Sequence, residues 1–329
     1  MNKKYALCIG INSYPDTDCD LSGCVNDAQD WAFELRSRGF VFETLLDGAA
    51  TGSAIRDALT ALTQRAKPGD VVFVTFSGHG SFVVHEGGYG RDGMDGCWCP
   101  YDVVEQGPIT DEDLKRIFSK RMGGVRWVVL SDSCHSGTVR RFVPGEPDYD
   151  AFEDRKMQSV RFLAPSVFDD RLDLVARDLA DARFQASPPG RDVALLMSGC
   201  EEGEYSYDTY FRERPNGAFT HAALTSLREL GGDASYLDWH HRLREYLPSS
   251  RFPQTPQLHG DQTAEDWQAL RFDGEDEHWA SAMRLGDFGG NVTPISFPSP
   301  RERRSSQGKS PPGIMRQRPR NRIPSDSED

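Results

Sequence analysis

The chain has 329 residues, 51 acidic and 38 basic side chains, and a formal net charge of −13 at pH 7. This length suits one large α/β domain with extensions, and a second full domain is not required. The acidic balance argues against nucleic acid as the main partner; it suits a protein that attracts basic peptides, and solubilising charge explains it equally well.

The first part of the chain alternates apolar runs with amphipathic stretches, which predict strands and helices respectively. Single helices between successive strands imply a mainly parallel sheet with helices on both faces. A long loop is expected over residues 81–108. The predicted strands are Tyr5–Ile11, Val41–Leu46, Val71–Phe76 and Val125–Leu130, and the predicted helices are Val25–Arg38, Ser53–Ala66 and Asp111–Ser119.

The pattern breaks after residue 137. Residues 138–191 are polar and interrupted by prolines, so they predict an exposed linker, with a short helix at Leu172–Leu179. Residues 273–329 form a basic tail rich in Pro, Ser and Arg, a composition that predicts disorder. This tail is either solvated or docks on the acidic body of the protein. Between them we expect a strand at Val193–Ser198, helices at Ala218–Leu230 and Tyr236–Leu247, and an edge strand at Gln254–Leu258, which contains Pro256.

Two Gly-flanked motifs stand where apolar strands end, Ser77-Gly78-His79-Gly80 and Asp132-Ser133-Cys134-His135-Ser136-Gly137. Functional groups gather beyond the carboxyl ends of parallel strands, so we expect His79 and Cys134 to share one cleft. A nearby imidazole activates a thiol that is mostly protonated at neutral pH, and it can protonate a leaving amine. The pattern predicts thiol-dependent acyl transfer. His85 and His135 are rival bases, and each motif alone is also explained by capping or packing.

These motifs resemble those of the caspase-like cysteine peptidases, and more closely the metacaspases and their bacterial relatives. The signature around Cys134 looks like that of metacaspases, and His79 precedes it by 55 residues, near the spacing of about 50 in caspases. The resemblance covers residues from about 3 to about 272 and includes further matching segments. These are Tyr5–Asn12, Leu21–Asp27, Ile109–Leu114, Leu196–Cys200, Asn216–Thr220 and Gln254–Leu258.

The resemblance implies a caspase-like three-layer α/β sandwich acting as a cysteine endopeptidase, a thiol protease with Cys134 as nucleophile and His79 as general acid and base. It implies an oxyanion hole formed by the backbone N–H groups of Gly80 and Cys134. It also implies cleavage after Arg or Lys, because the residues matching its specificity pocket include carboxylates. They are Cys24, Asp27, Ser77 and Asp132. Otherwise, Asp27 is explained as a helix N-terminal charge and Asp132 as a strand-end cap.

The resemblance also predicts the organisation of the chain. Residues 1–137 correspond to a large segment with the His/Cys dyad, 138–191 to the linker, 192–272 to a small segment that completes the cleft, and 273–329 to the tail. Self-cleavage is expected at basic positions of the linker, which are Arg140-Arg141, Arg155-Lys156 and Arg161.

No cofactor is required for this chemistry. Calcium stimulation stays open: the resemblance implies tentative ligands at Asp95, Asp111 and Glu112, but Arg140 and Arg141 stand near the place of a further acidic ligand. A zinc site at Cys97-Trp98-Cys99 is disfavoured because one intervening residue is too short for the usual zinc knuckle.

The expected partners are polypeptides with Arg or Lys before the cut bond, not nucleic acid or membranes. The sequence has seven cysteines without a regular framework, no signal-peptide pattern and no apolar run of about 20 residues. We therefore expect a reduced, cytoplasmic protein that acts as a monomer. The alternative from a different class is a catalytically silent caspase-fold adaptor.

Overall fold

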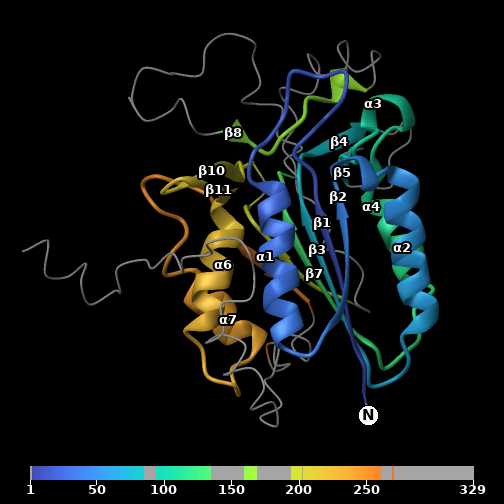
Figure 1. The fold of residues 1–329 in the computed structure, drawn as a ribbon, viewed down its shortest axis with the longest axis vertical. Helices are drawn as coiled ribbons and strands as arrows, with labels where there is room; N and C mark the ends of the chain where they lie inside the picture. Colours follow the sequence, from blue (N-terminus) through green and yellow to red (C-terminus); the bar gives the residue numbers. More distant parts are fainter. Residues whose placement is uncertain are drawn as a thin grey trace, which may run out of the picture. The chain divides into compact units, whose positions relative to one another are not determined.

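A six-stranded sheet forms the centre of the computed structural model, with helices on both of its faces (Figure 1). The structure describes residues 2–84, 94–134, 159–168, 194–201, 203–260 and residue 269. The strand order is β12-β9-β7-β3-β1-β2, and every neighbouring pair is parallel except β12 with β9. The strands are β1 (Lys4–Gly10), β2 (Val41–Leu46), β3 (Val71–Ser77), β7 (Arg126–Asp132), β9 (Ala194–Ser198) and β12 (Gln257–His259). The predicted mainly parallel α/β architecture is confirmed.

The middle strands are buried on both faces, which explains their nearly unbroken apolar sequences. In β1, β3 and β7 every residue after the first is buried, whereas β2 at the sheet edge has no buried residue. The chain runs from β1 outward to β2 and returns to β3 on the other side of β1. Open α/β sheets bind ligands beyond the carboxyl ends of the strands at such a reversal, which here lies at β1 and β3.

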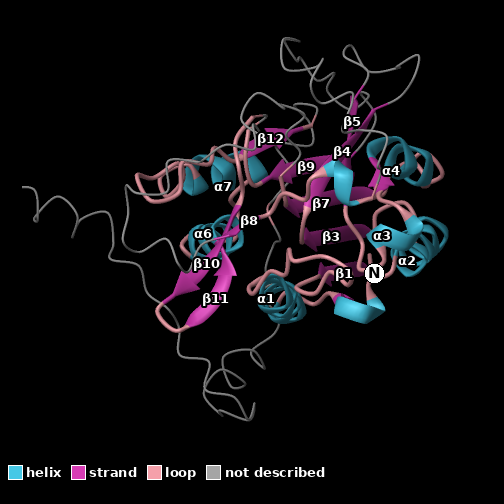
Figure 2. Cartoon of the chain, turned by 90° about the horizontal axis from the view of Figure 1, so that it is seen from above, coloured by secondary structure: helices cyan, strands magenta, loops and turns pink. Residues whose placement is uncertain are grey.

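Helices α1, α6 and α7 cover one face, and α2 and α4 cover the other (Figure 2). Trp31 of α1 packs against Phe73 of β3 and Trp239 of α7, with ring centroids 5.7 and 5.9 Å apart. On the other face, α2 contributes Ile55 and Leu59 to the core, and burial of such a side chain stabilises the fold by about 1.5–3 kcal/mol. The helices are α1 (Cys24–Ser37), α2 (Gly52–Arg65), α4 (Asp111–Phe118), α6 (Ala218–Arg228) and α7 (Tyr236–Leu243).

A small antiparallel sheet replaces part of the loop expected over residues 81–108. It consists of β4 (Gly80–Val84), β5 (Met94–Trp98) and β6 (Ile109–Thr110), and the short helix α3 (Val103–Gln106) follows β5. The loop prediction is wrong for these residues, because stacking of Trp98 on Phe76 at 4.5 Å anchors β5 to the end of β3. The sequence of this region is rich in glycine and acidic residues, which is typical of a loop and gives no sign of this packing.

A second small sheet joins β8 (Ser159–Val160), β10 (Tyr207–Phe211) and β11 (Arg214–Gly217). β8 belongs to the linker that was expected to be exposed. That expectation is wrong for Arg161 and Leu163, which are both 0% exposed. β8 pairs with the edge of β10, the Arg161 side chain contacts acidic side chains, and Leu163 packs in the apolar core. The predicted helix at Leu172–Leu179 and the predicted tail lie outside the described residues.

Within the described part of the chain, the helices are too short or too polar to traverse a lipid bilayer.

Candidate active site

Strand register places the two sequence motifs at the same level of the sheet. β3 and β7 are parallel neighbours in which Ser77 and Asp132 are partners. His79 and Cys134 each follow two residues later, so both emerge from the same end of adjacent strands. Gly80 permits this close approach, because a Cβ at that position would lie 2.0 Å from the carbonyl oxygen of Cys134.

His79 is buried and is held by two groups from the segment that follows β1. Its Nε2 lies 2.6 Å from the carbonyl oxygen of Cys19, which can only accept, so Nε2 carries the proton. The backbone N–H of His79 donates to the hydroxyl of Tyr14 at 2.7 Å. The other ring nitrogen, Nδ1, is buried and has no hydrogen-bond partner among the described residues. In this tautomer Nδ1 is the basic nitrogen.

Burial lowers the pKa of His79 to about 4, the carbonyl of Cys19 acts in the opposite direction, and the charge of Arg161 lowers the pKa further. The imidazole is therefore neutral at pH 7 and able to accept a proton at Nδ1.

The Cys134 thiol is buried and contacts the backbone of Ser206. Its Sγ accepts a hydrogen bond from the N–H of Ser206 at 3.0 Å. Nearby, the Cys200 thiol donates to the carbonyl of Ser133 at 3.8 Å, and interaction with Cys134 together with burial raises the pKa of Cys200. Neither nitrogen of His79 bonds the thiol here. Hydrogen bonds between catalytic groups often tighten only when a substrate is in reaction geometry.

The carbonyl oxygen of Arg161 occupies the space between the two motifs. It accepts hydrogen bonds from the N–H groups of Gly80 at 2.9 Å and Cys134 at 3.1 Å. The N–H of Arg161 donates to the carbonyl of Ser206 at 2.9 Å, and β8 before it pairs antiparallel with β10. An extended segment of the chain thus crosses the carboxyl end of the sheet, with one peptide carbonyl polarised by two donors.

The Arg161 side chain is fully buried in a pocket that we call the basic-residue pocket, formed by Asp27, Ser77, Asp132 and Asp208. Its Nη2 donates to Asp27 Oδ2 at 2.7 Å and to Asp208 Oδ1 at 2.8 Å. Its Nη1 lies 2.9 Å from Asp132 Oδ2 and donates to Ser77 Oγ at 2.7 Å. Burial alone would lower the pKa of Arg161, but the surrounding acidic groups raise it above its ordinary value.

A shell of donors holds the carboxylates of this pocket in place. Thr220 donates to Asp132 Oδ2 through its N–H at 3.0 Å and its hydroxyl at 2.7 Å, and Ser206 Oγ donates to Asp132 Oδ1 at 2.5 Å. Asp27 accepts from Asn216 Nδ2 at 2.9 Å and from the N–H of Gly217 at 3.0 Å. Hydrogen bonds to an ionised carboxylate are stronger than neutral ones, so these donors help to fix each carboxylate in position.

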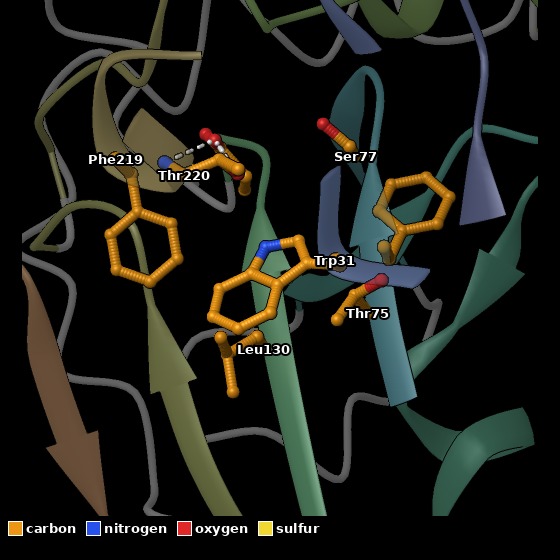
Figure 3. Close-up of a pocket in the computed structure, with 8 residues that line it drawn as sticks. Trp31, Thr75, Ser77, Leu130, Phe219 and Thr220 are labelled. Carbon is orange, nitrogen blue, oxygen red and sulfur yellow. Dashed lines mark hydrogen bonds between the residues drawn. The ribbon is translucent and has the colours of Figure 1, made fainter. Parts of the chain in front are cut away.

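The floor beneath the pocket is apolar. Trp31 lies beneath Ser77 and Thr220 and near Leu130 and Phe219 (Figure 3). These apolar side chains exclude water, and burial raises the pKa of Asp27 to about 6, while Arg161 acts in the opposite direction. An incompletely paired carboxylate there is costly, so the pocket strongly favours a cation.

The structure brings most of the predicted site residues together. Gly80 and Cys134 bind the Arg161 carbonyl, and Asp27, Ser77 and Asp132 bind its guanidinium. Cys24 is buried at the start of α1, where burial raises the pKa of its thiol and Arg161 lowers it. The rival bases His85 and His135 and the cleavage candidates Arg140-Arg141 and Arg155-Lys156 lie outside the described residues.

The tentative calcium ligands do not form a recognisable site within the described residues, which contain no group of three His, Cys, Asp or Glu side chains placed to hold a metal ion. Asp111 and Glu112 lie in the first turn of α4, where acidic residues also complement the helix dipole. Asp95 is in β5, and its side chain lies outside the described part.

Sequence reasoning missed several groups. Asp208 in β10 has no motif around it, and its role appears only because β10 lies beside the start of α1, where Asp208 accepts from the N–H of Ser22 at 2.8 Å. The Cys19 carbonyl orients His79, a task that no side chain in the sequence could be assigned, and no sequence pattern reports a backbone carbonyl. Ser206 lies between the thiol and Asp132.

Comparison with known proteins identifies the family of the chain. A family model described as "Caspase domain" matches residues 3–266. The chain belongs to this family. The caspase-domain chain is 43% identical over 144 residues to metacaspase-7 of Arabidopsis thaliana, which covers 41% of this chain and 35% of that protein. It is 27% identical over 289 residues to metacaspase-1 of Saccharomyces cerevisiae, covering 78% of this chain and 66% of the relative.

Among solved structures, the caspase-domain chain is similar to protein GSU0716 from Geobacter sulfurreducens. The two align with a TM-score of 0.61 and 28% identity, over 82% of this chain and 99% of the other. The chain thus spans about a third of the length of the plant relative and 66% of that of the yeast relative. The comparisons therefore show the family and the fold of this chain.

Proposed function

We propose that this caspase-domain protein is a cysteine endopeptidase that cleaves polypeptides after Arg or Lys. One observation supports it above all others: Arg161 presents its carbonyl to two backbone donors and its guanidinium to three carboxylates. A substrate for such an enzyme needs these two interactions at the residue before the cut bond.

The proposed reaction begins with proton transfer from the Cys134 thiol to Nδ1 of His79. The thiolate sulfur then bonds to the carbonyl carbon, and the N–H groups of Gly80 and Cys134 stabilise the resulting oxyanion. The imidazolium gives its proton to the amide nitrogen as the carbon–nitrogen bond breaks, which leaves a thioester. His79 next takes a proton from water, whose oxygen attacks the thioester carbon, and the sulfur leaves as the thiol.

His79 is suited to this sequence by its hydrogen bond to Cys19. That bond keeps the proton on Nε2 and the lone pair on Nδ1. The proposed reaction requires Cys134 Sγ to leave its contact with the N–H of Ser206 and to approach Nδ1 of His79. The described geometry then represents a resting arrangement with a segment of the chain in the substrate position.

The proposal includes self-cleavage of the bond between Arg161 and Phe162, action as a monomer and a cytoplasmic location. All seven cysteines are free, which supports a reducing compartment. Because the described residues supply no complete metal site, calcium enters the proposal as a variable of the assay and not as part of the reaction.

The test is hydrolysis of fluorogenic peptides that end in Arg, Lys or Asp, measured with calcium and with a chelator. We expect turnover of the Arg and Lys peptides and a loss of about 1,000-fold or more in Cys134→Ala. Cys8→Ala is the matched control, because Cys8 is a buried thiol in β1 away from the site, and it should keep its activity. Absence of turnover of basic peptides, together with failure of a thiol-reactive probe to label Cys134, would instead favour the adaptor function.

A further inference from the structure

The segment that follows Arg161 is held by the backbone of β4. Phe162 and Gly80 form a parallel bridge. The N–H of Leu163 donates to the carbonyl of Gly80 at 3.0 Å, and Ser81 Oγ donates to the carbonyl of Leu163 at 2.7 Å. Main-chain pairing of this kind fixes the register of any extended peptide and leaves selection to the side chains.

The first residue after the proposed cut bond meets an aromatic surface. The ring of Phe162 stacks on Phe82 with centroids 6.3 Å apart and an interplanar angle of 24°, and it meets Tyr205 edge-on at 6.4 Å. Offset-stacked and edge-to-face pairs add to the stabilisation that burial provides. We call Phe82 and Tyr205 the first leaving-side subsite.

The second residue enters the hydrophobic core. Leu163 is 0% exposed and belongs to the core cluster on the face covered by α2 and α4. We call the apolar surroundings of Leu163 the second leaving-side subsite. A charged side chain there would lose its hydration without gaining a partner, which is unfavourable.

Resting on the proposed function, we propose that the site also selects its substrates on the leaving side of the cut bond. The first residue after Arg or Lys is aromatic, and the second is an aliphatic residue of leucine size, with acidic residues rejected at the second position. The substrate class is therefore a polypeptide containing a basic, an aromatic and an aliphatic residue in succession.

The experiment uses internally quenched peptides with the sequence of residues 159–165, Ser-Val-Arg-Phe-Leu-Ala-Pro, and the self-cleaved wild-type protein. We expect kcat/KM to fall at least about tenfold when the peptide carries Leu163→Asp or Leu163→Ala, and severalfold with Phe162→Gly. Equal kcat/KM across the panel, within about twofold, would overturn the selection. On the enzyme side, Phe82→Ala should reduce the ratio of kcat/KM between the Phe and Gly peptides, which a purely structural role would not change.

A dye-terminated Arg substrate, which has no residue after the cut bond, separates this proposal from the proposed function. If the dye substrate is hydrolysed and the panel shows no preference, the leaving-side subsites are rejected and the endopeptidase stands. Hydrolysis of the dye substrate alone would also reject them, because no peptide would then enter the subsites. If no substrate is hydrolysed, the endopeptidase itself is rejected.

Discussion

At the scale of residues, the site is governed by three buried carboxylates that share one guanidinium. Asp27, Asp132 and Asp208 are each 4% exposed or less at the side chain and lie within 2.9 Å of Arg161. A buried charge cluster of this kind is unfavourable unless its hydrogen bonds are complete. Any occupant of the basic-residue pocket must therefore supply both positive charge and several donors.

Asp208 provides a direct test of this view. We expect Asp208→Asn to lower kcat/KM for Arg peptides about 10- to 100-fold, because it removes the charge that Arg161 Nη2 contacts. The control is Asp57→Asn, which removes an equal charge from an exposed position on α2. Steady-state kinetics with Arg peptides measures kcat/KM for both variants. Equal losses of kcat/KM in the two variants would show that Asp208 acts only through the net charge of the protein.

The need for glycine at position 217 could not be predicted from the sequence. The resemblance includes the segment Asn216–Thr220, but the sequence assigns no role to its members. A Cβ at Gly217 would lie 2.2 Å from Asp132 Oδ2 and 2.6 Å from Arg161 Nη1, so the pocket requires glycine there. The prediction of Asp27 and Asp132 needed only a motif, whereas the requirement for Gly217 depends on three segments that meet in the fold.

At the scale of elements, the parallel sheet and its helices were predictable and the small sheets were not. The boundaries of β2 agree with the prediction, and those of β1, α1, α2, β3 and α4 agree within one residue. These elements carry strong apolar patterns. β10 has no such pattern, since its Asp208 and Thr209 are polar residues buried by contacts with distant segments.

The edge strand near the end of the described region illustrates a partial success. β12 lies at the sheet edge as expected, but it begins at Gln257, after Pro256. Gln254, which was placed in that strand, instead donates to the carbonyl of Gly199 at 2.8 Å and accepts from the N–H of Tyr207 at 3.1 Å. The Gln254 side-chain amide hydrogen-bonds two backbone groups near the site, so Gln254 is not part of the hydrogen-bonded strand β12.

A buried histidine in helix α6 predicts how the stability of the fold depends on pH. His221 stacks on Phe211 of β10 with centroids 3.7 Å apart, and burial lowers its pKa to about 3, with Arg228 and Arg214 acting in the same direction. In the unfolded chain His221 becomes protonated near pH 6.5, whereas in the folded chain it stays neutral until the pH approaches 3. The stability that neutral His221 contributes is therefore present above pH 6.5 and is lost as the pH falls toward 3.

We expect His221→Gln, made in the Cys134→Ala background, to flatten the fall of unfolding free energy between pH 6.5 and 4.5 by up to about 1.4 kcal/mol per pH unit. Urea unfolding at several pH values measures this slope. In both proteins His79 contributes to the slope in the same direction as His221 and Asp27 in the opposite direction. The difference in slope between the two proteins therefore reports His221. The exposed His241→Gln is the control, and a slope in His221→Gln equal to that of the control would contradict the prediction.

At the scale of the whole molecule, the chain places part of its own linker where a substrate would lie. The sequence identified Arg161 as one of several basic positions open to cleavage, but it treated the linker as exposed. The placement depends on a strand edge in β10, a pocket shared by α1, β3, β7 and β10, and a core position for Leu163. None of these is encoded in the linker itself, so composition alone could not reveal it.

The most direct test of this account is N-terminal sequencing of the fragments that form when the purified chain is incubated. We expect a new N-terminus at Phe162 in the wild-type protein and no fragment in Cys134→Ala. Cleavage only at other bonds, or the same Phe162 terminus in Cys134→Ala, would contradict the claim that Arg161 lies in the substrate position of a Cys134-dependent peptidase.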